Sequence, residues 1–223
     1  MTEPIKIDIW SDVACPWCYI GKRNLEAGLA AFSNAEGSLP VEIEYRSFEL
    51  APDTPVEFAG SQVDFLVKHK GLSEDQVRAM LERVTGIAEA AGLDYDFDAL
   101  QHTNTVKAHQ LLHYAKTHGL QQEAKERLLR AYFIEGRHVG RVADLADLAA
   151  EIGLDRDDVM RSLQDDEYLA DVRADMRQAQ EYGVHGVPFF VIDGRYGISG
   201  AQPPSVFAGA LAQVATERRE VPA

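Results

Sequence analysis

The stretch SDVACPWCYIGKRN, residues 11–24, holds both cysteines of this 223-residue chain. They form one Cys-x-x-Cys motif, CPWC, at Cys15 and Cys18, so the chain has no other pair of residues that can form a disulfide. The preceding IKIDIW, residues 5–10, alternates apolar and polar residues, which predicts a β-strand. Pro16 suits the first position of a helix, because its missing N–H costs that helix no hydrogen bond. The motif therefore lies where a strand is followed by a helix.

This position predicts reactive chemistry for Cys15. The first-turn N–H groups of a helix and its dipole stabilise a thiolate more than a thiol, and such settings lower a cysteine pKa from about 8.5 to roughly 3.5–7.5. Cys18 follows one helical turn later on the same face, within reach of a disulfide. Exchange with a substrate thiol or disulfide would therefore use Cys15 as the nucleophile and Cys18 as the resolving thiol. Trp17 carries no charge, so the pair is expected to be less oxidising than one with histidine there.

Two other interpretations of the cysteines are open from the residues alone. A structural zinc site needs about four nitrogen or sulfur ligands, and this chain has a single Cys-x-x-Cys. His109 and His113 have metal-compatible spacing on one expected helix, but no third ligand accompanies them, so no metal is predicted. The cysteines could instead be small buried residues of a core. The strand-to-helix position and Pro16 favour redox chemistry over both.

A second signal is YGVHGVPFFVIDG, residues 182–194, in which Pro188 precedes an apolar run, Phe189–Ile192. Proline is tolerated at the first residue of a central strand. A trans proline would mark a loop, whereas a cis Val187–Pro188 bond would let Pro188 face the cysteine pair and let Val187 pair with an extended substrate. The presence of the CPWC motif favours the cis form.

The candidate site residues follow from these two signals. Asp12 could modulate proton transfer to Cys18, or cap the turn before the helix. His185 could border the site, or be an ordinary residue of a surface loop. The residues predicted to bind substrate are Pro16, Trp17, Val187 and Pro188.

The order of elements along the chain predicts an α/β fold. VEIEYRSF, residues 41–48, is a second expected strand, and a strand–helix–strand unit implies parallel pairing. Helical patterns fill residues 56–182, including a capping box at Ser73 and Gln76. Asp193 and Gly194 then predict a type I′ hairpin turn, before a closing helix that begins near Pro204. This is the layout of a thioredoxin-like fold, β-α-β … α-β-β-α, with a large all-helical insertion.

The same layout predicts two structural units. Residues 1–55 plus 166–223 would form the thioredoxin-like domain, and residues 56–165 the helical insertion domain.

Composition excludes several classes of function. The chain has 22 Lys and Arg against 36 Asp and Glu, a formal net charge of −14. This balance argues against binding to nucleic acid or to an anionic membrane, since both need clustered cations. No apolar run is long enough to span a membrane, and MTEPIKIDIW shows no signal-peptide pattern, so a cytoplasmic location is predicted.

The CPWC after a strand, the distant GVHGVPFFVIDG, YRSFELAPD (residues 45–53) and NTVKAHQLLHYA (residues 104–115) together resemble the DsbA-like thioredoxin superfamily. The closer resemblance is to its FrnE-type branch, which is grouped with 2-hydroxychromene-2-carboxylate isomerases. It implies a thioredoxin fold with a helical insertion, thiol–disulfide oxidoreductase activity without metal or organic cofactor, and a cis Val187–Pro188 bond beside Cys15.

The resemblance also implies an alternative. The related isomerases and kappa-class transferases use glutathione and usually have serine where this chain has Cys15, so glutathione is a possible co-substrate. A third hypothesis is a non-enzymatic helical interaction module with structural cysteines. The expected partners are thiol or disulfide substrates, of protein or small-molecule kind, and the chain is expected to be a monomer or a homodimer.

Overall fold

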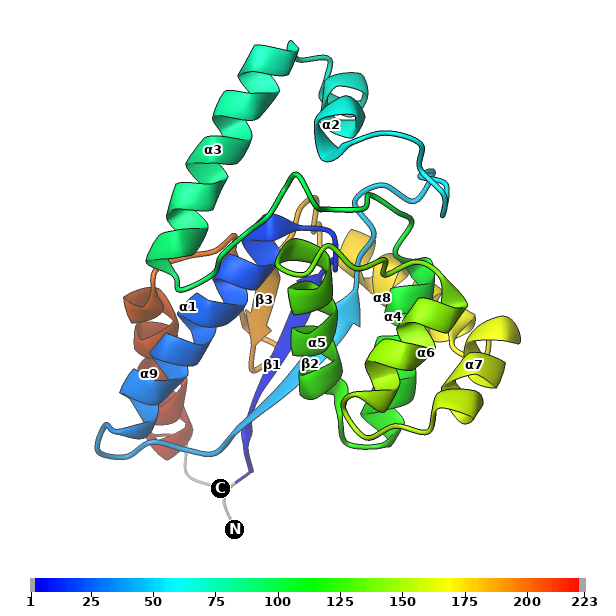
Figure 1. Cartoon of the computed structure of the whole chain (residues 1–223). Helices are drawn as coiled ribbons and strands as arrows, with labels where there is room; N and C mark the ends of the chain where they lie inside the picture. Colours follow the sequence, from blue (N-terminus) through cyan, green and yellow to red (C-terminus); the bar gives the residue numbers. More distant parts are fainter. Residues whose placement is uncertain (1–2, 221–223) are drawn as a thin grey trace.

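The structure is a computed structural model that describes residues 3–220 (Figure 1). Its helices and strands follow in this order: β1 Ile5–Ser11, α1 Pro16–Ser33, β2 Val41–Ser47, α2 Gln62–Lys70, α3 Glu74–Ala90, α4 Val106–Thr117, α5 Gln121–Phe133, α6 Val142–Ala150, α7 Arg156–Gln164, α8 Leu169–Glu181, β3 Phe189–Ile192, β4 Tyr196–Ser199 and α9 Pro204–Glu220.

The four strands form one sheet in the order β2-β1-β3-β4. β1 pairs with β2 in parallel, as the strand–helix–strand pattern predicted, with Ile7 opposite Ile43. β3 runs antiparallel to both β1 and β4. This arrangement confirms the predicted α/β thioredoxin-like fold with a helical insertion between β2 and β3.

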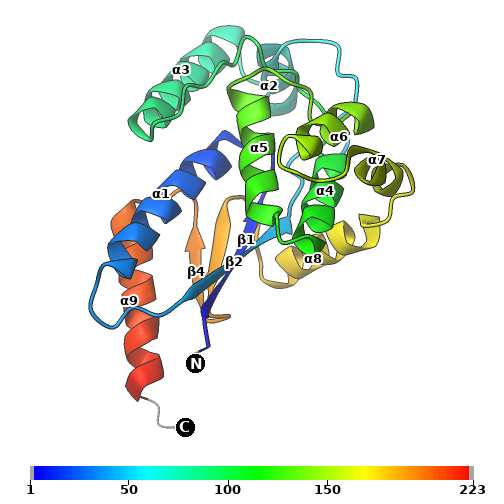
Figure 2. The same ribbon diagram turned by 60° about the horizontal axis from the view of Figure 1, so that its bottom comes forward.

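The two faces of the sheet are covered by different helices. On one face, the alternate residues Ile5, Ile7 and Ile9 of β1 are buried in an apolar cluster with residues of α1 and α9. α1 and α9 lie side by side (Figures 1 and 2). On the other face, Trp10 is buried beside α8, and its indole N–H donates to the Asp175 carbonyl oxygen over 3.0 Å. Because successive side chains of β1 point to opposite faces of the sheet, its isoleucines pack in one layer and Trp10 packs in the other.

The inserted helices form two groups. α4 to α7 share one apolar core, which also includes Tyr19 and Ile20 of α1. α2 and α3 form a helical pair, drawn at the top of Figure 1, with its own apolar cluster. The core of α4 to α7 is therefore continuous with the first helix of the thioredoxin fold. The bounds predicted for two separate domains, which include residues 1–2 and 221–223 outside the described part, stay a prediction.

Two predicted local signals are present in the structure. The capping box of Ser73 with Gln76 is present at the start of α3. Asp193 and Gly194 have φ angles of 56° and 67°, the signs that a type I′ turn requires, and Arg195 N–H donates to the Ile192 carbonyl.

Other local details differ from the prediction. α2 was not predicted as a separate helix: it has only nine residues, begun by a capping box of Ser61 and Asp64. Thr105 is the N-cap residue of α4, and the side chain of the preceding Asn104 accepts a hydrogen bond from Val106 N–H. Lys22 of α1 is 8% exposed and forms an ion pair with Glu126.

In the described part of the chain, no helix has the length and apolar character needed to cross a membrane.

Candidate active site

Cys15 is the N-cap of α1 and Pro16 its first residue, so the motif lies where β1 passes into α1, as predicted. The Val187–Pro188 peptide bond is cis. The Cys15 sulfur lies 3.5 Å from the Val187 carbonyl oxygen, a distance that suits an S–H···O hydrogen bond. Cys15 and Val187, which are 172 positions apart in the sequence, are thus in contact.

Close packing of α1 against the Pro188 segment depends on Gly21. A Cβ on Gly21 would lie 2.9 Å from Cγ of Pro188 and 3.4 Å from the ring of Phe190. The first distance is shorter than carbon atoms tolerate, so a side chain at this position would push the two segments apart.

Both cysteines are free thiols and are 3% exposed. Burial alone also fits the interpretation of two structural cysteines. The two sulfurs differ, however, in what they face: Cys15 lines a cavity of about 580 Å³, and Cys18 does not. Access to the pair is therefore through Cys15.

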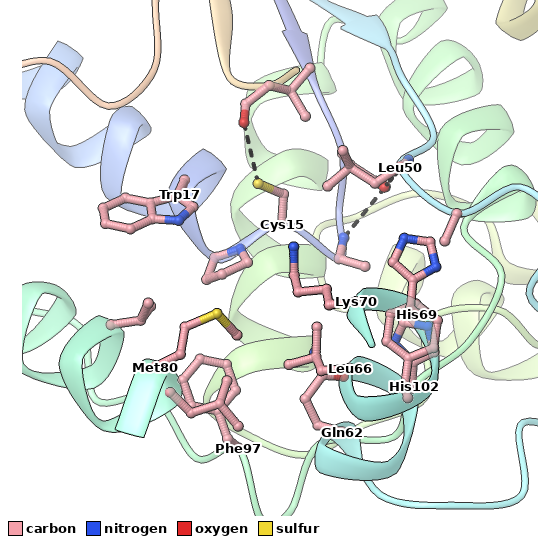
Figure 3. A pocket seen from close by; sticks show the side chains of 18 of the residues that line it. Cys15, Trp17, Leu50, Gln62, Leu66, His69, Lys70, Met80, Phe97 and His102 are labelled. Atoms are coloured by element: carbon pink, nitrogen blue, oxygen red, sulfur yellow. Dashed lines mark hydrogen bonds between the residues drawn. The ribbon is translucent and has the colours of Figure 1, made fainter. Parts of the chain in front are cut away.

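The cavity lies between the start of α1 and the α2–α3 pair. On the α1 side it is lined by Cys15, Pro16 and the 40%-exposed Trp17, with Val187 nearby. Figure 3 shows Cys15 and Trp17 at one end of this space. Three of the four predicted substrate-binding residues, Pro16, Trp17 and Val187, thus line the cavity, while Pro188 lies against Gly21 of α1.

Asp12 is buried and ties together the segments around the motif. One carboxylate oxygen accepts hydrogen bonds from Val13 N–H at 2.7 Å and from the Thr105 hydroxyl at 2.8 Å, and lies 3.2 Å from Nε2 of His109. The other oxygen accepts from Leu50 N–H at 2.9 Å. The expectation that Asp12 caps the turn is confirmed, and the same carboxylate also holds α4 and the segment after β2.

The pKa of Asp12 reflects these contacts. Burial acts to raise it, but the hydrogen bond and positive charge of His109, with the N–H of Leu50, lower it overall.

A buried lysine lies behind the motif. Lys125 of α5 is fully buried, and its amine donates to the carbonyl oxygen of Ser11 over 3.1 Å. Burial lowers the pKa of Lys125 to about 8, against the negative charge of Cys18, which raises it. Its cation also lies 5.5 Å from the ring centroid of Tyr45. Sequence reasoning missed Lys125, because nothing in its amphipathic helix distinguishes it from a solvated lysine.

The pKa values of the two thiols move in opposite directions. The pKa of Cys15 is raised well above its usual range, first by the hydrogen bond to Cys18 and then by burial. Burial also acts to raise the pKa of Cys18, but the hydrogen bond with Cys15 and the charge of Lys125 lower this pKa overall. The expected lowering at Cys15 is therefore wrong for this reduced pair. The nearby Asp12 carboxylate also disfavours a Cys15 thiolate.

His185, a predicted modulator, is exposed in the loop before Val187 and does not line the cavity. His109 and His113, weighed as metal ligands, instead contact two different aspartates, Asp12 and Asp175. Among residues 3–220, no three His, Cys, Asp or Glu side chains are grouped to hold a metal ion.

Two further polar residues of the cavity were not found from the sequence. Gln62 opens α2, and His102 lies in the segment before α4; both are buried and line the cavity. No sequence motif marks these two residues as part of a site, since a lone glutamine and a lone histidine are common on helices and loops.

The chain matches known proteins over nearly its whole length. The model of the family described as DSBA-like thioredoxin domain matches residues 6–212. A probable DsbA oxidoreductase of Streptomyces coelicolor is 39% identical with a TM-score of 0.88, covering 98% of this chain and 93% of that one.

Two other solved structures share the fold at lower identity. A cytosolic disulfide reductase, DsbM of Pseudomonas aeruginosa, solved with glutathione, is 19% identical with a TM-score of 0.64, covering 96% and 99% of the two chains. A 2-hydroxychromene-2-carboxylate isomerase is 16% identical with a TM-score of 0.69, covering 98% and 100%. On the match to the family model and the 39% identity, the chain belongs to the family of DSBA-like thioredoxin domains.

Proposed function

We propose that this protein is a dithiol–disulfide oxidoreductase that works through Cys15 and Cys18. The observation that carries the proposal is the asymmetry of the pair: Cys15 faces a cavity, and Cys18 hydrogen-bonds to it from the protein side, near the cation of Lys125. A pair of structural cysteines would need neither the cavity nor the cation.

The reaction begins with loss of one proton from the dithiol. The resulting negative charge is held by the S–H···S⁻ hydrogen bond between the cysteines and by Lys125. As the Cys15 proton passes to the Cys18 sulfur, Cys15 attacks one sulfur of a substrate disulfide. A Cys15–substrate disulfide forms, and the other substrate sulfur leaves as a thiolate that takes up a proton.

Cys18 completes the exchange. Having lost its proton, it attacks the Cys15 sulfur, forms the Cys15–Cys18 disulfide and releases the second substrate thiol. The enzyme dithiol is oxidised by two electrons and the substrate disulfide is reduced by two. The reverse sequence oxidises a substrate dithiol. The position of Val187 supports the proposal that this residue binds substrate, because its carbonyl oxygen lies 3.5 Å from the reacting sulfur of Cys15.

Trapping tests the assigned roles. Cys18→Ser should accumulate a mixed disulfide with hydroxyethyl disulfide at Cys15, seen by intact mass, whereas Cys15→Ser should accumulate far less. Wild type should instead proceed to the internal disulfide. Equal labelling of the two single variants, or equal reduction rates for wild type and Cys15→Ser, would reject the proposal.

A glutathione-dependent isomerase or transferase is the second candidate. It is supported by the cavity beside Cys15 and by the fold shared with the isomerase. In that reaction Cys15 would position glutathione and Cys18 would be dispensable. Glutathione-dependent turnover that survives Cys18→Ala would favour this candidate over the oxidoreductase.

We also propose that the protein acts in the cytoplasm. The fold shared with a cytosolic disulfide reductase supports this location. Fractionation of the native host, with a cytoplasmic marker protein as the control, tests it.

A further inference from the structure

We propose that the cavity at Cys15 selects small organic disulfides with an apolar, ring-sized body and an acidic group, and that Gln62 and His102 determine this selectivity. The inference rests on the proposed function and adds the class of substrate. Thiol–disulfide exchange needs only the two cysteines, so the side chains that line the cavity have another role.

The size and covering of the cavity favour a small molecule. Its volume of about 580 Å³ lies within the range of sites that enclose ligands of low molecular weight. The α2–α3 pair forms its outer wall, opposite the start of α1 (Figures 1 and 3). Cys15 is only 3% exposed, so a substrate reaches its sulfur through the cavity.

The middle of the cavity is apolar. Its walls carry aromatic, aliphatic and thioether side chains from α2, α3 and the segment after α3, namely Phe65, Leu66, Met80, Leu81, Val84 and Phe97. A flat apolar body buried among such side chains gains free energy at about 25 cal/mol for each Å² removed from water. A strongly polar tripeptide such as glutathione offers little of this area.

Two buried polar atoms without partners belong to residues that line this apolar space. Oε1 of Gln62 and Nε2 of His102 are buried and make no hydrogen bond with any described residue, and the two residues are 6% and 5% exposed. Leaving a buried polar atom unpaired costs roughly 1–3 kcal/mol. A ligand that supplies the missing hydrogen bonds would recover that free energy and would be preferred over one that does not.

The state of His102 limits what it can offer. Its Nδ1 lies 3.2 Å from the hydroxyl of Tyr132, and its ring stacks on Phe65 of α2. Burial lowers the pKa of His102 to about 4, so the ring is neutral near pH 7. A neutral imidazole with one nitrogen on Tyr132 has the other free to make a single hydrogen bond to a ligand. Gln62, whose amide can turn, offers either a donor or an acceptor.

The charges of the lining favour an anion. Lys70 and Arg83 are exposed side chains that line the cavity, and the lining contains one acid, Asp12, whose carboxylate already accepts several hydrogen bonds. This excess of cations stands out in a chain with a net charge of −14. Figure 3 shows Lys70 between Cys15 and the far end, where Gln62 and Phe97 lie. An acidic group near Lys70 would leave the apolar body pointing toward Gln62.

Single-turnover kinetics of the reduced protein test the selectivity. The probe is dithiobis-nitrobenzoate, an aromatic disulfide with a carboxylate on each ring, and the comparison disulfides are uncharged dithiodipyridine and glutathione disulfide. The rate should saturate with the first probe. Gln62→Met and His102→Phe, which keep apolar bulk, should each raise its half-saturating concentration by about three- to tenfold.

The charge is tested separately. Lys70→Gln should raise the half-saturating concentration for the nitrobenzoate probe and leave that for dithiodipyridine unchanged. Lys68→Gln is the matched control, since this lysine lies on the same helix but does not line the cavity.

The outcomes separate the two proposals. If Gln62→Met and His102→Phe leave the half-saturating concentration within twofold of wild type, or if the rate never saturates, the selectivity is overturned. In that case, Cys15-dependent reduction of hydroxyethyl disulfide would still support the oxidoreductase. Loss of that Cys15 dependence would overturn the proposed function itself.

Discussion

The amine of Lys125 donates a hydrogen bond to the carbonyl oxygen of Ser11 over 3.1 Å, which places a fully buried cation of α5 at the end of β1. Within residues 3–220, the amine of Lys125 forms no salt bridge with a carboxylate. The positive charge acts on the thiol of Cys18, whose pKa it lowers. A residue of the helical insertion thus tunes the chemistry of the thioredoxin-like part.

Lys125→Met should make the dithiol harder to ionise. Removing a nearby opposite charge raises the pKa of a thiol, so the pH midpoint of thiolate formation should rise by about 1–2 pH units. Ultraviolet absorbance of the thiolate across pH measures this midpoint. Lys116→Met, on the surface of α4, is the control and should leave the midpoint unchanged. An unchanged midpoint in Lys125→Met would contradict the electrostatic role.

Asp12→Asn should have two separable effects. The Asp12 carboxylate accepts hydrogen bonds from Leu50 N–H and the Thr105 hydroxyl, whereas the amide NH₂ of asparagine is a donor and cannot accept them. The free energy of unfolding should therefore fall by roughly 1–3 kcal/mol. The lost negative charge should lower the pKa of Cys15, because the carboxylate raises it. Urea unfolding measures the first effect and the pH dependence of alkylation the second. A stable variant with unchanged alkylation would disprove both.

Glu126→Gln should weaken the junction between α5 and α1 in a pH-dependent way. Glu126 accepts hydrogen bonds from Arg23 at 2.5 Å and from the Tyr19 hydroxyl at 2.6 Å, and pairs with Lys22 at 2.6 Å. Burial acts to raise its pKa, but these contacts lower it to about 2. Its folded pKa is thus below the unfolded value of about 4.3, so its contribution to stability is present above that value and is lost as pH falls toward 2.

The expected difference between wild type and Glu126→Gln is therefore about 1–2 kcal/mol at pH 7, after allowing for solvent screening, and it should shrink below about pH 4. Urea unfolding at pH 7, 5, 4 and 3 follows this change. Glu123→Gln, an exposed residue of the same helix, is the control. A difference that stays constant across this range would exclude the ion-pair explanation.

Gly21→Ala should separate α1 from the Pro188 segment. The added Cβ would lie 2.9 Å from Pro188, so repacking should lower the free energy of unfolding by about 1–3 kcal/mol and reduce the exchange rate at Cys15. Gly86→Ala is the matched control, since a Cβ at Gly86 of α3 meets no atom within 4 Å. Relief of the helix cost of glycine should stabilise that variant by about 0.5–1 kcal/mol. Equal effects of the two substitutions would show that the contact with Pro188 is unimportant.

The sequence alone determined the frame of this protein. The alternation of residues 5–10 and 41–47, the proline at the start of α1 and the Asp193–Gly194 turn are local signals. Each acts through backbone preferences and the period of its own segment, which is why the parallel pairing of β1 with β2 and the position of Cys15 at the start of α1 were predictable.

Only the tertiary structure decided the chemistry of the site. The direction of the thiol pKa shifts depends on burial, on the hydrogen bond between the two cysteines and on the charges of Asp12 and Lys125. Asp12 precedes the motif in the sequence, but packing brings Lys125 to it from α5 and the Val187 carbonyl from the segment before β3. Likewise, α2 and α3 create the cavity by lying across the start of α1. Electrostatic energies depend on the distance between charges and on their burial, and neither quantity can be predicted from the spacing of residues along one segment.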